Sequence, residues 1–342
     1  MIAIHHKEKS FSDKWIQYCQ LYHVPFKTVN CLNSNIMSQL HCCDGLMWHW
    51  FQYDSKAILF ARQLTYSLEQ VGKRVFPDSM TAWHFDDKLG QKYLLEAIGA
   101  PLVPAHIFFS RKDAMVWIKK TKLPTVFKLR CGAGAINVKL VRTQQQAEKL
   151  IRRAFGRGFA VNDRISSFHD RTRHFQRNKT LKNIFHVFKG LVRIVYAPVD
   201  DRLRPRERGY IYFQDFIPDM DSDIRVVVIG KRAFAIRRAI REGDFRASGS
   251  GLIDHDPTKI PMECIKTAFD LNRKLNTQCI AFDFAAVGND IYLFEISYGF
   301  DPKGYAACPG FWDDALNWHE GSFYPEWFMI EDFLQTIAGR NT

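Results

Sequence analysis

Residues 281–301, AFDFAAVGNDIYLFEISYGFD, constrain the fold of this chain more than any other stretch. Two mostly apolar runs flank Gly288-Asn289-Asp290, a three-residue connection with the glycine that hairpin loops favour. A hairpin with this loop pairs Val287 with Ile291, Ala285 with Leu293, and Asp283 with Glu295. The sequence therefore predicts two carboxylates opposite each other on an antiparallel sheet.

Two opposed carboxylates need a positive charge between them. Directly opposed residues have Cβ atoms roughly 5 Å apart, so the two acids would repel each other in poorly solvated, phenylalanine-rich surroundings. One interpretation places a lysine or arginine from another segment between them. The other places Mg²⁺ there, a hard cation that binds carboxylate oxygens together with substrate phosphates. The hairpin residues alone leave both interpretations open.

The composition is that of a globular protein. The 342 residues are 46% hydrophobic, 14% aromatic and 25% charged, which argues against a disordered chain. The segment MIAIHHKEKS lacks the plan of a secretory signal, and no 18-residue apolar run could span a bilayer, so we expect a cytoplasmic protein. The eight scattered cysteines form no CxxC pair, so we expect reduced thiols and neither a disulfide framework nor a zinc site.

Most of the positive charge lies in one segment. The formal net charge is +12, and residues 151–210 carry fifteen Lys or Arg against five Asp or Glu, which is +10 of that total. Residues 180–195 within it are amphipathic. This pattern is compatible with a helix packed on its own domain, with contact to an anionic membrane surface, or with an anionic polymer or phosphorylated substrate. Nucleic acid is disfavoured, because no nucleic-acid fold accompanies the charge.

Two further groups of residues are typical of phosphate binding. Lys128 ends a predicted strand before Gly132-Ala133-Gly134, a loop whose main chain can approach phosphate closely. Alone, such a tripeptide is more often an ordinary turn. A predicted hairpin turning near Gly230 brings together Arg225, Arg237, Arg238 and Arg246. Converging arginines can bind phosphate or carboxylate, although a single arginine on a strand more often belongs to a solvated face.

In this order, the motifs resemble the ATP-grasp superfamily. In chain order they are Asp87-Lys88 at a helix start, Lys128 before the glycine loop, the strand 212–217, Asp223-x-Arg225, an arginine pair, Arg246, Asp283, and Glu295-x-Ser297. The likeness covers about residues 80–300. It is greatest to D-alanine:D-alanine ligases, to ribosomal-protein glutamate ligases and to ATP-grasp proteins of bacterial surface-polysaccharide clusters.

The resemblance implies a mixed α/β and α+β fold in which two subdomains sandwich ATP. A small α/β pre-ATP-grasp domain is expected at residues 1–78, where short apolar runs alternate with helical patterns. The central subdomain is expected at 79–214, with the glycine loop at 132–136 and a basic insertion at about 156–209. The C-terminal subdomain, with the metal-binding hairpin, is expected at 215–342.

The resemblance also implies a role for each motif residue. ATP would be bound by Lys88, Lys128, Gly132, Ala133, Gly134, Gln214, Asp215, Phe216, Ile217 and Asp219. The catalytic residues that hold the γ-phosphate and the reacting carboxylate would be Arg225, Arg238 and Arg246. Mg²⁺ would be bound by Asp283, Glu295 and Ser297. The family usually has Asn at the last position, so Ser297 implies a weaker ligand, help from water or Asp301, or diminished catalysis.

The activity implied by the resemblance is amide formation. Such enzymes transfer the γ-phosphoryl group of ATP to a carboxylate, and an amine then attacks the acyl phosphate, with release of ADP and phosphate. For this chain we expect an amino acid or amine to be joined to a sugar acid or sugar-linked carboxylate in capsule or surface-polysaccharide biosynthesis. Two alternatives stay open: an amino-acid or peptide ligase unconnected with sugars, and a non-catalytic ATP-binding scaffold or regulatory protein at the inner face of an anionic membrane.

Overall fold

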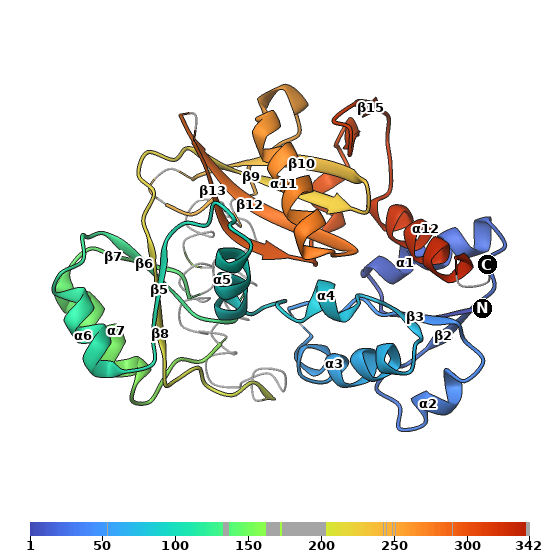
Figure 1. Ribbon diagram of the computed structural model, residues 1–342, viewed down its shortest axis with the longest axis horizontal. Helices are drawn as coiled ribbons and strands as arrows, with labels where there is room; N and C mark the ends of the chain where they lie inside the picture. Colours follow the sequence, from blue (N-terminus) through green and yellow to red (C-terminus); the bar gives the residue numbers. More distant parts are fainter. Residues whose placement is uncertain are drawn as a thin grey trace.

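Three β-sheets organise the chain in the computed structural model, and helices cover them (Figure 1). The structure describes residues 1–52, 54–132, 137–161, 172, 203–241, 243, 245–247, 249, 251–288 and 290–339. Ala133 and Gly134 of the glycine loop lie outside these ranges, as does most of the predicted basic insertion. None of the described helices has the length and apolar character needed to cross a membrane.

The first sheet is parallel, as the alternating sequence pattern predicts, with strand order β2-β1-β3-β4. Its elements are β1 (Ile2–His5), α1 (Phe11–Leu21), β2 (Phe26–Val29), α2 (Ile36–Gln39), β3 (Gly45–Met47), α3 (Ser55–Gln70) and β4 (Arg74–Phe76). Alternate residues of β1 point to opposite faces, so Ala3 packs with α3 whereas Ile2 and Ile4 pack with α1. Both faces are therefore buried, as parallel sheets require.

The second sheet is antiparallel, with strand order β5-β8-β6-β7. Its elements are β5 (Ala105–Phe108), α6 (Arg111–Ile118), β6 (Thr125–Lys128), β7 (Lys139–Val141), α7 (Gln144–Ala154) and β8 (Ile211–Asp215). Helices α6 and α7 pack together on it, at the left of Figure 1. Ser110 and Thr143 cap these helices by accepting main-chain N–H bonds from their first turns. The sheet and its two helices share a hydrophobic core of their own.

The third sheet is also antiparallel, with strand order β13-β12-β9-β10-β14-β15 and β11 paired to β10. Its strands are β9 (Ser222–Ile229), β10 (Arg232–Ala239), β11 (Ile253–Asp254), β12 (Cys279–Val287), β13 (Asp290–Ser297), β14 (Gly310–Asp313) and β15 (Trp318–Glu320). Helix α11 (Met262–Leu275) lies across one face (Figure 1), and Leu95 of α5 (Lys88–Ala97) joins the same core. The remaining elements are α4 (Ser79–Ala82), α12 (Pro325–Ala338), and the 3₁₀ turns η1 (Pro257–Lys259) and η2 (Pro302–Tyr305).

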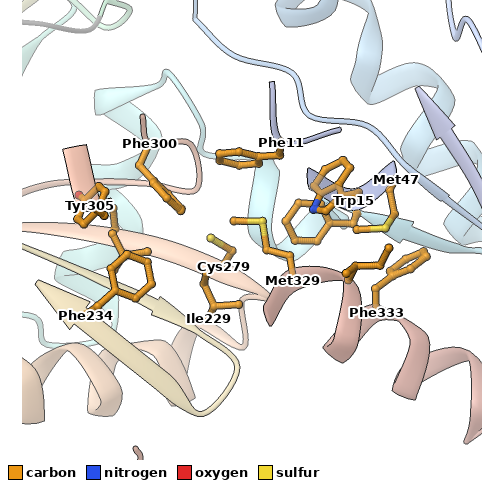
Figure 2. Packing of buried hydrophobic residues seen from close by; sticks show 14 of the residues in the cluster. Phe11, Trp15, Met47, Ile229, Phe234, Cys279, Phe300, Tyr305, Met329 and Phe333 are labelled. Atoms are coloured by element: carbon orange, nitrogen blue, oxygen red, sulfur yellow. The ribbon is translucent and has the colours of Figure 1, made fainter. Parts of the chain in front are cut away.

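The opposite face of the third sheet shares one core with the first sheet. Figure 2 shows Trp15 of α1 and Met47 of β3 in a cluster with Ile229 and Cys279 of the third sheet and Phe333 of α12. Helix α12 also contacts α1 and β4. The first sheet, the third sheet and α12 are therefore packed as one unit.

The face of the third sheet that packs against the first sheet changes from apolar to charged along β9 and β12. Val227 on β9 and Ala281 on β12 belong to the shared core, and two residues away on each strand stand Arg225 and Asp283. Because side chains two apart point the same way, these charged groups continue the buried face towards its open end. The register of the sheet thus places charge where the packed core stops.

The hairpin of β12 and β13 contains the predicted Asp283–Glu295 pair, but the register on the loop side of this pair differs from the prediction. Asp283 pairs with Glu295, which confirms that prediction. The predicted partners of Ala285 and Val287 are wrong, because Ala285 pairs with Tyr292 and Val287 with Asp290. Asp290 belongs to β13 and not to the loop, so the turn is one residue shorter than predicted. A β-bulge next to the acidic pair takes up the extra residue, and the two differences cancel.

Candidate functional site

A cavity between the second and third sheets brings most of the predicted binding residues together. The predicted residues that line it are Lys88, Lys128, Gly132, Gln214, Asp215, Phe216, Ile217, Arg246, Asp283 and Glu295. The rest of its lining is mainly apolar: Val126, Val138, Met220, Phe245, Ala247 and Phe294, with the acidic Asp223. Apolar walls with a few converging charges are typical of a pocket for a small organic ligand.

The end of β8 supplies the polar main chain of this cavity. Gln214 and Asp215 are used within the sheet: the Gln214 carbonyl accepts from Thr125 Oγ1 at 2.8 Å, and the Asp215 N–H donates to the Pro104 carbonyl at 2.9 Å. Among the described residues, no main-chain hydrogen bond is found for Phe216 or Ile217. Of the four residues predicted here, these two have main-chain groups available to a ligand.

Two buried lysines enter the cavity from different elements. Lys88 is the first residue of α5, which Asp87 caps by accepting the Gly90 N–H at 3.0 Å. Lys128 is the last residue of β6. Burial lowers the pKa of Lys128 to about 8, more than the neighbouring carboxylates can offset. For Lys88, Glu295 and Asp86 outweigh burial and raise the pKa above its ordinary value. Of the two lysines, Lys128 is therefore the one whose positive charge is less neutralised by neighbouring carboxylates.

The start of the glycine loop is tied to the start of α5. The Gly132 N–H donates to Asp86 Oδ1 at 2.7 Å, and Lys88 Nζ donates to the Gly132 carbonyl at 2.8 Å. Asp86 has a positive φ of 56° and also binds Arg204 at 3.1 Å. The Lys88 N–H donates to the Arg130 carbonyl at 2.9 Å. These bonds fix where the loop leaves β6.

A buried network of arginines and carboxylates holds the acidic pair. Arg225 Nη1 lies 3.0 Å from both oxygens of Asp283. Arg238 binds Asp223 through two hydrogen bonds of 2.6 and 2.7 Å, and its Nη2 lies 3.1 Å from Asp283 Oδ1. Arg225 of β9 and Arg238 of β10 thus neutralise Asp283 from the side of β12 that faces away from β13.

Glu295 has its own cation. Its carboxylate lies 3.2 Å from Lys88 Nζ. Burial alone would raise the pKa of Glu295, but the surrounding cations, Lys88 foremost, lower it to about 2. Glu295 is therefore a carboxylate at every physiological pH.

Two of the residues singled out in the sequence, Arg237 and Asp219, lie away from this network. Arg237 is on the opposite face of β10 and binds Asp221 and Ser222, so its predicted place beside Arg225 is wrong. Strand alternation explains this, because neighbouring residues of a strand point to opposite faces. Asp219 is exposed and does not line the cavity. Ser297 lines a second cavity together with Arg225 and Arg238. Its hydroxyl donates at 2.7 Å to the Gly299 carbonyl, which also accepts from Arg225 Nη2 at 3.3 Å.

A second cavity of about 480 Å³ adjoins the first. The two share Lys88, Gly132 and Glu295 in their linings. The lining of the second cavity also includes residues of the loops after β1 and β3, Asp86, Arg225, Arg238, and residues 296, 297 and 299–305. Two ligands could therefore lie on either side of Lys88 and Glu295.

Solved structures share the fold over nearly the whole chain. A RimK domain ATP-grasp protein from Sphaerobacter thermophilus aligns with 98% of this chain and 99% of its own, at 15% identity and a TM-score of 0.55. D-alanine–D-alanine ligase from Bacillus anthracis, complexed with ATP, aligns with 99% of this chain and 97% of its own, at 11% identity and a TM-score of 0.57. The chain has the ATP-grasp fold.

A third ATP-grasp likeness comes from a structure with bound nucleotide and metal. The biotin carboxylase domain of the 2-oxoglutarate carboxylase from Hydrogenobacter thermophilus, in complex with MgADP, aligns with 99% of this chain and 69% of its own, at 11% identity and a TM-score of 0.59. No protein-family model matches the sequence, and no curated protein matches it significantly. The fold predicted from the ordered motifs is confirmed by these structures.

The acidic pair of this ATP-grasp fold fits Mg²⁺ as part of a nucleotide complex. Asp283 and Glu295 line the same cavity and offer hard oxygen ligands. Within the described ranges, no group of three or more His, Cys, Asp and Glu residues could hold a metal by itself. Mg²⁺ is commonly bound by one or two carboxylates together with substrate phosphates. The residues present therefore fit a metal whose remaining ligands come from phosphate.

Sequence reasoning missed the residues that support the site. Arg130 binds both Asp87 at 3.2 Å and Glu207 at 2.9 Å, and Glu207 accepts from the Tyr210 hydroxyl at 2.7 Å. This links β6, α5 and the entry to β8. A signal was present in RLRPRERG, where Glu207 is the one acid within a basic run. Phe294, at the bulge of β13, also lines the first cavity, and an apolar residue within a strand gives no sequence signal for this.

Proposed function

We propose that this chain is an ATP- and Mg²⁺-dependent ligase that joins a carboxylate to an amine through an acyl phosphate. The observation that carries the proposal is the meeting of two cavities at Lys88 and Glu295. Phosphoryl transfer requires the γ-phosphate of ATP and the acceptor carboxylate to be held close together in a fixed orientation. Two adjoining cavities that share Lys88 and Glu295 support such an arrangement. The ATP bound to the Bacillus anthracis ligase with the same fold adds support.

In this proposal ATP occupies the first cavity. The adenine lies between the apolar walls and hydrogen-bonds the main chain at Phe216 and Ile217, while Lys88 and Lys128 bind the phosphates. Water is excluded by the apolar lining, which strengthens these charge interactions. The Gly132 N–H and carbonyl are already bonded to Asp86 and Lys88, so Gly132 fixes the start of the loop and the phosphate contacts come from the lysines.

The chemical step proceeds in two parts. A carboxylate oxygen of the acceptor forms a bond to the γ-phosphorus, and the bond between the β,γ-bridging oxygen and that phosphorus breaks to release ADP. The amine then attacks the acyl carbon, a C–N bond forms, and inorganic phosphate leaves. Arg225, Arg238 and Arg246 orient the acceptor and stabilise the negative charge that develops. No side-chain nucleophile is required.

Mg²⁺ bound at Asp283 and Glu295 would neutralise negative charge on the ATP phosphates. In its absence, the protein's own contribution at this point is the pairing of Asp283 with Arg225 and Arg238, and of Glu295 with Lys88. These contacts keep the two carboxylates at fixed positions. The cations also offset their mutual repulsion, so the site is prepared before a nucleotide binds.

For the substrates we propose an amino acid or amine and a sugar acid or sugar-linked carboxylate used in surface-polysaccharide biosynthesis. This part rests on the motif resemblance. An amino-acid or peptide ligase unconnected with sugars is the alternative within the same chemistry. The two differ in which carboxylate stimulates ADP release.

A non-catalytic ATP-binding protein is a second candidate, favoured by one observation. Asp283 and Glu295 are already neutralised by Arg225, Arg238 and Lys88, so the site is electrostatically balanced without metal. A role at an anionic membrane would involve the basic segment 151–210, most of which lies outside the described residues. Binding to phosphatidylserine vesicles at low ionic strength tests that role, and its absence there would contradict it.

The deciding experiment follows ADP and phosphate release from Mg·ATP. The protein is incubated with pools of amino acids, with and without nucleotide-linked uronic acids. The ligase proposal predicts release that depends on both acceptor and amine and is lost in Lys128→Ala. Lys122→Ala, an exposed lysine of the same subdomain, is the matched control and should retain activity.

Other outcomes separate the alternatives. ATP binding without turnover across broad pools would support the non-catalytic candidate. Release of AMP instead of ADP would refute the acyl-phosphate mechanism. ADP release that needs only amino acids would favour the peptide-ligase alternative.

A further inference from the structure

The second cavity has an uneven distribution of charge. Its lining contains five basic residues and three acidic ones; these are Lys9, Lys88, Arg225, Arg238 and Lys303 against Asp86, Glu295 and Asp301. Two of the acids are already paired, Asp86 with Arg204 and Glu295 with Lys88. Asp283 and Asp223 in turn pair with the two arginines. The inner part of the cavity is therefore close to balanced.

The imbalance lies at the exposed part of the lining. Lys9, which follows β1, and Lys303, in η2, are both exposed, whereas Arg238 is buried and Glu295 is partly buried. Within the part of the chain that the structure describes, neither ammonium group has a carboxylate within 4.0 Å. Lys7 offers a contrast, because it pairs with Asp54. Asp301 is exposed at the same mouth, and its Oδ1 accepts the Lys303 main-chain N–H at 3.1 Å.

The two lysines come from different segments of the chain that line the same cavity. Lys9 belongs to the first sheet's side, and Lys303 belongs to the segment after β13. The third sheet and the first share one hydrophobic core, so the elements that precede Lys9 and Lys303 are packed as one unit. Lys9 and Lys303 thus line the same cavity as Lys88 and Glu295.

We infer that the carboxylate substrate carries a second anionic group, a phosphate or another carboxylate, which Lys9 and Lys303 bind at the mouth of the cavity. The inference rests on the proposed ligase function, because it takes the inner end as the place of the reacting carboxylate. Both lysines act as specificity residues. They attract the distal anion and have no contact with the reacting atoms.

The test uses two sugar acids that differ by one phosphate. Glucuronic acid and glucuronic acid 1-phosphate are titrated separately into the protein saturated with Mg·ADP, and binding is measured by calorimetry. The wild-type protein should prefer the phosphorylated compound by about tenfold, and the preference should weaken as salt rises. Lys9→Ala and Lys303→Ala should each lower it about two- to fivefold, the range for exposed charges, and the double variant should bind both compounds alike.

Lys266→Ala, an exposed lysine on α11 outside both cavities, is the control and should keep the preference. Equal binding of the two sugar acids by the wild-type protein, or no binding of either up to millimolar concentration, would overturn the inference. So would an unchanged preference in the double variant. The ligase proposal has its own readout in ADP release, so it can stand or fail separately.

Discussion

Asp283 and Glu295 face each other across β12 and β13, yet each is bound by a different set of cations. Asp283 is held by Arg225 and Arg238, and Glu295 by Lys88. Removing one member of a buried ion pair leaves the other charge uncompensated, which costs more than the pair contributes. The stability of the protein without nucleotide should therefore depend on these acids.

The Asp283→Asn substitution tests this dependence. It leaves Arg225 without its carboxylate partner, and we expect the free energy of unfolding to fall by about 3 kcal/mol, measured by urea denaturation of the nucleotide-free protein. Asp314→Asn serves as the control, because Asp314 is an exposed partner of Lys231 at 3.6 Å and such pairs contribute little. Equal losses in the two variants would contradict the prediction.

Lys128 should reduce stability at neutral pH. Its pKa is about 8 in the folded protein and about 10.4 in an unfolded chain, so below pH 8 both states are charged and the folded state bears the full cost of burial. Between the two values the unfolded state binds more protons, and stability rises with pH. We expect Lys128→Met to stabilise the protein at pH 7 by an amount on the order of 2 kcal/mol, with the gain disappearing above about pH 10.4.

The same lysine should make ATP binding depend on pH. As pH rises above about 8, the nucleotide-free protein loses the Lys128 charge, so ATP affinity should fall. Calorimetry from pH 7 to 9.5 on the wild type and Lys128→Met measures this, and the variant should bind weakly without the additional fall. A similar pH profile in both proteins would rule out Lys128 as its source.

The Asp86 and Arg204 pair should act on nucleotide binding as one unit. Asp86→Asn tolerates the positive φ but loses the charge that holds Arg204. We expect this variant and Arg204→Ala each to raise the KM for ATP several-fold with little change in kcat. The double variant should be no worse than the single ones, since residues in one network are not additive. Fully additive effects would show that the two act independently.

Ser297 should prove to be a structural residue of the turn after β13. Its hydroxyl donates to the Gly299 carbonyl, so Ser297→Ala should cost about 1 kcal/mol of stability and leave the Mg²⁺ requirement of ADP release unchanged. A lower Mg²⁺ affinity in Ser297→Ala would instead identify the hydroxyl as a ligand. Ser297→Asn, which restores the residue of the resembled family, should raise activity.

The order of motifs predicted the fold, because each motif marked a place where a strand or helix ends at the same cavity. Lys88 begins α5, Lys128 ends β6, and both reach the first cavity. Strand register was harder to predict. The predicted pairing of Asp283 with Glu295 is confirmed, although the predicted loop is one residue too long. A β-bulge beside the pair compensates for this difference, and a pattern of alternating residues does not reveal a bulge.

The pairing of charges could not be predicted from one sequence. Arg225 and Arg238 belong to β9 and β10, and their partners come from β9 and β12, which only the sheet order brings together. The position of Arg237 could not be predicted for a similar reason. Which face of a strand points to the core is known only once the core itself is known. The ion pair of Arg130 and Glu207, which supports the site, joins residues that are far apart in the sequence, on either side of the predicted insertion.

Helix α12 sets an order for folding during synthesis. Residues such as Ile2 and Met47 on the first sheet are buried in a core that includes Met329 and Phe333. A ribosome makes that sheet and α1 early, but the core that they share is completed only when α12 has emerged. Part of this apolar face therefore stays uncovered until nearly all of these residues have been made, and chaperones that bind such surfaces would find their target there.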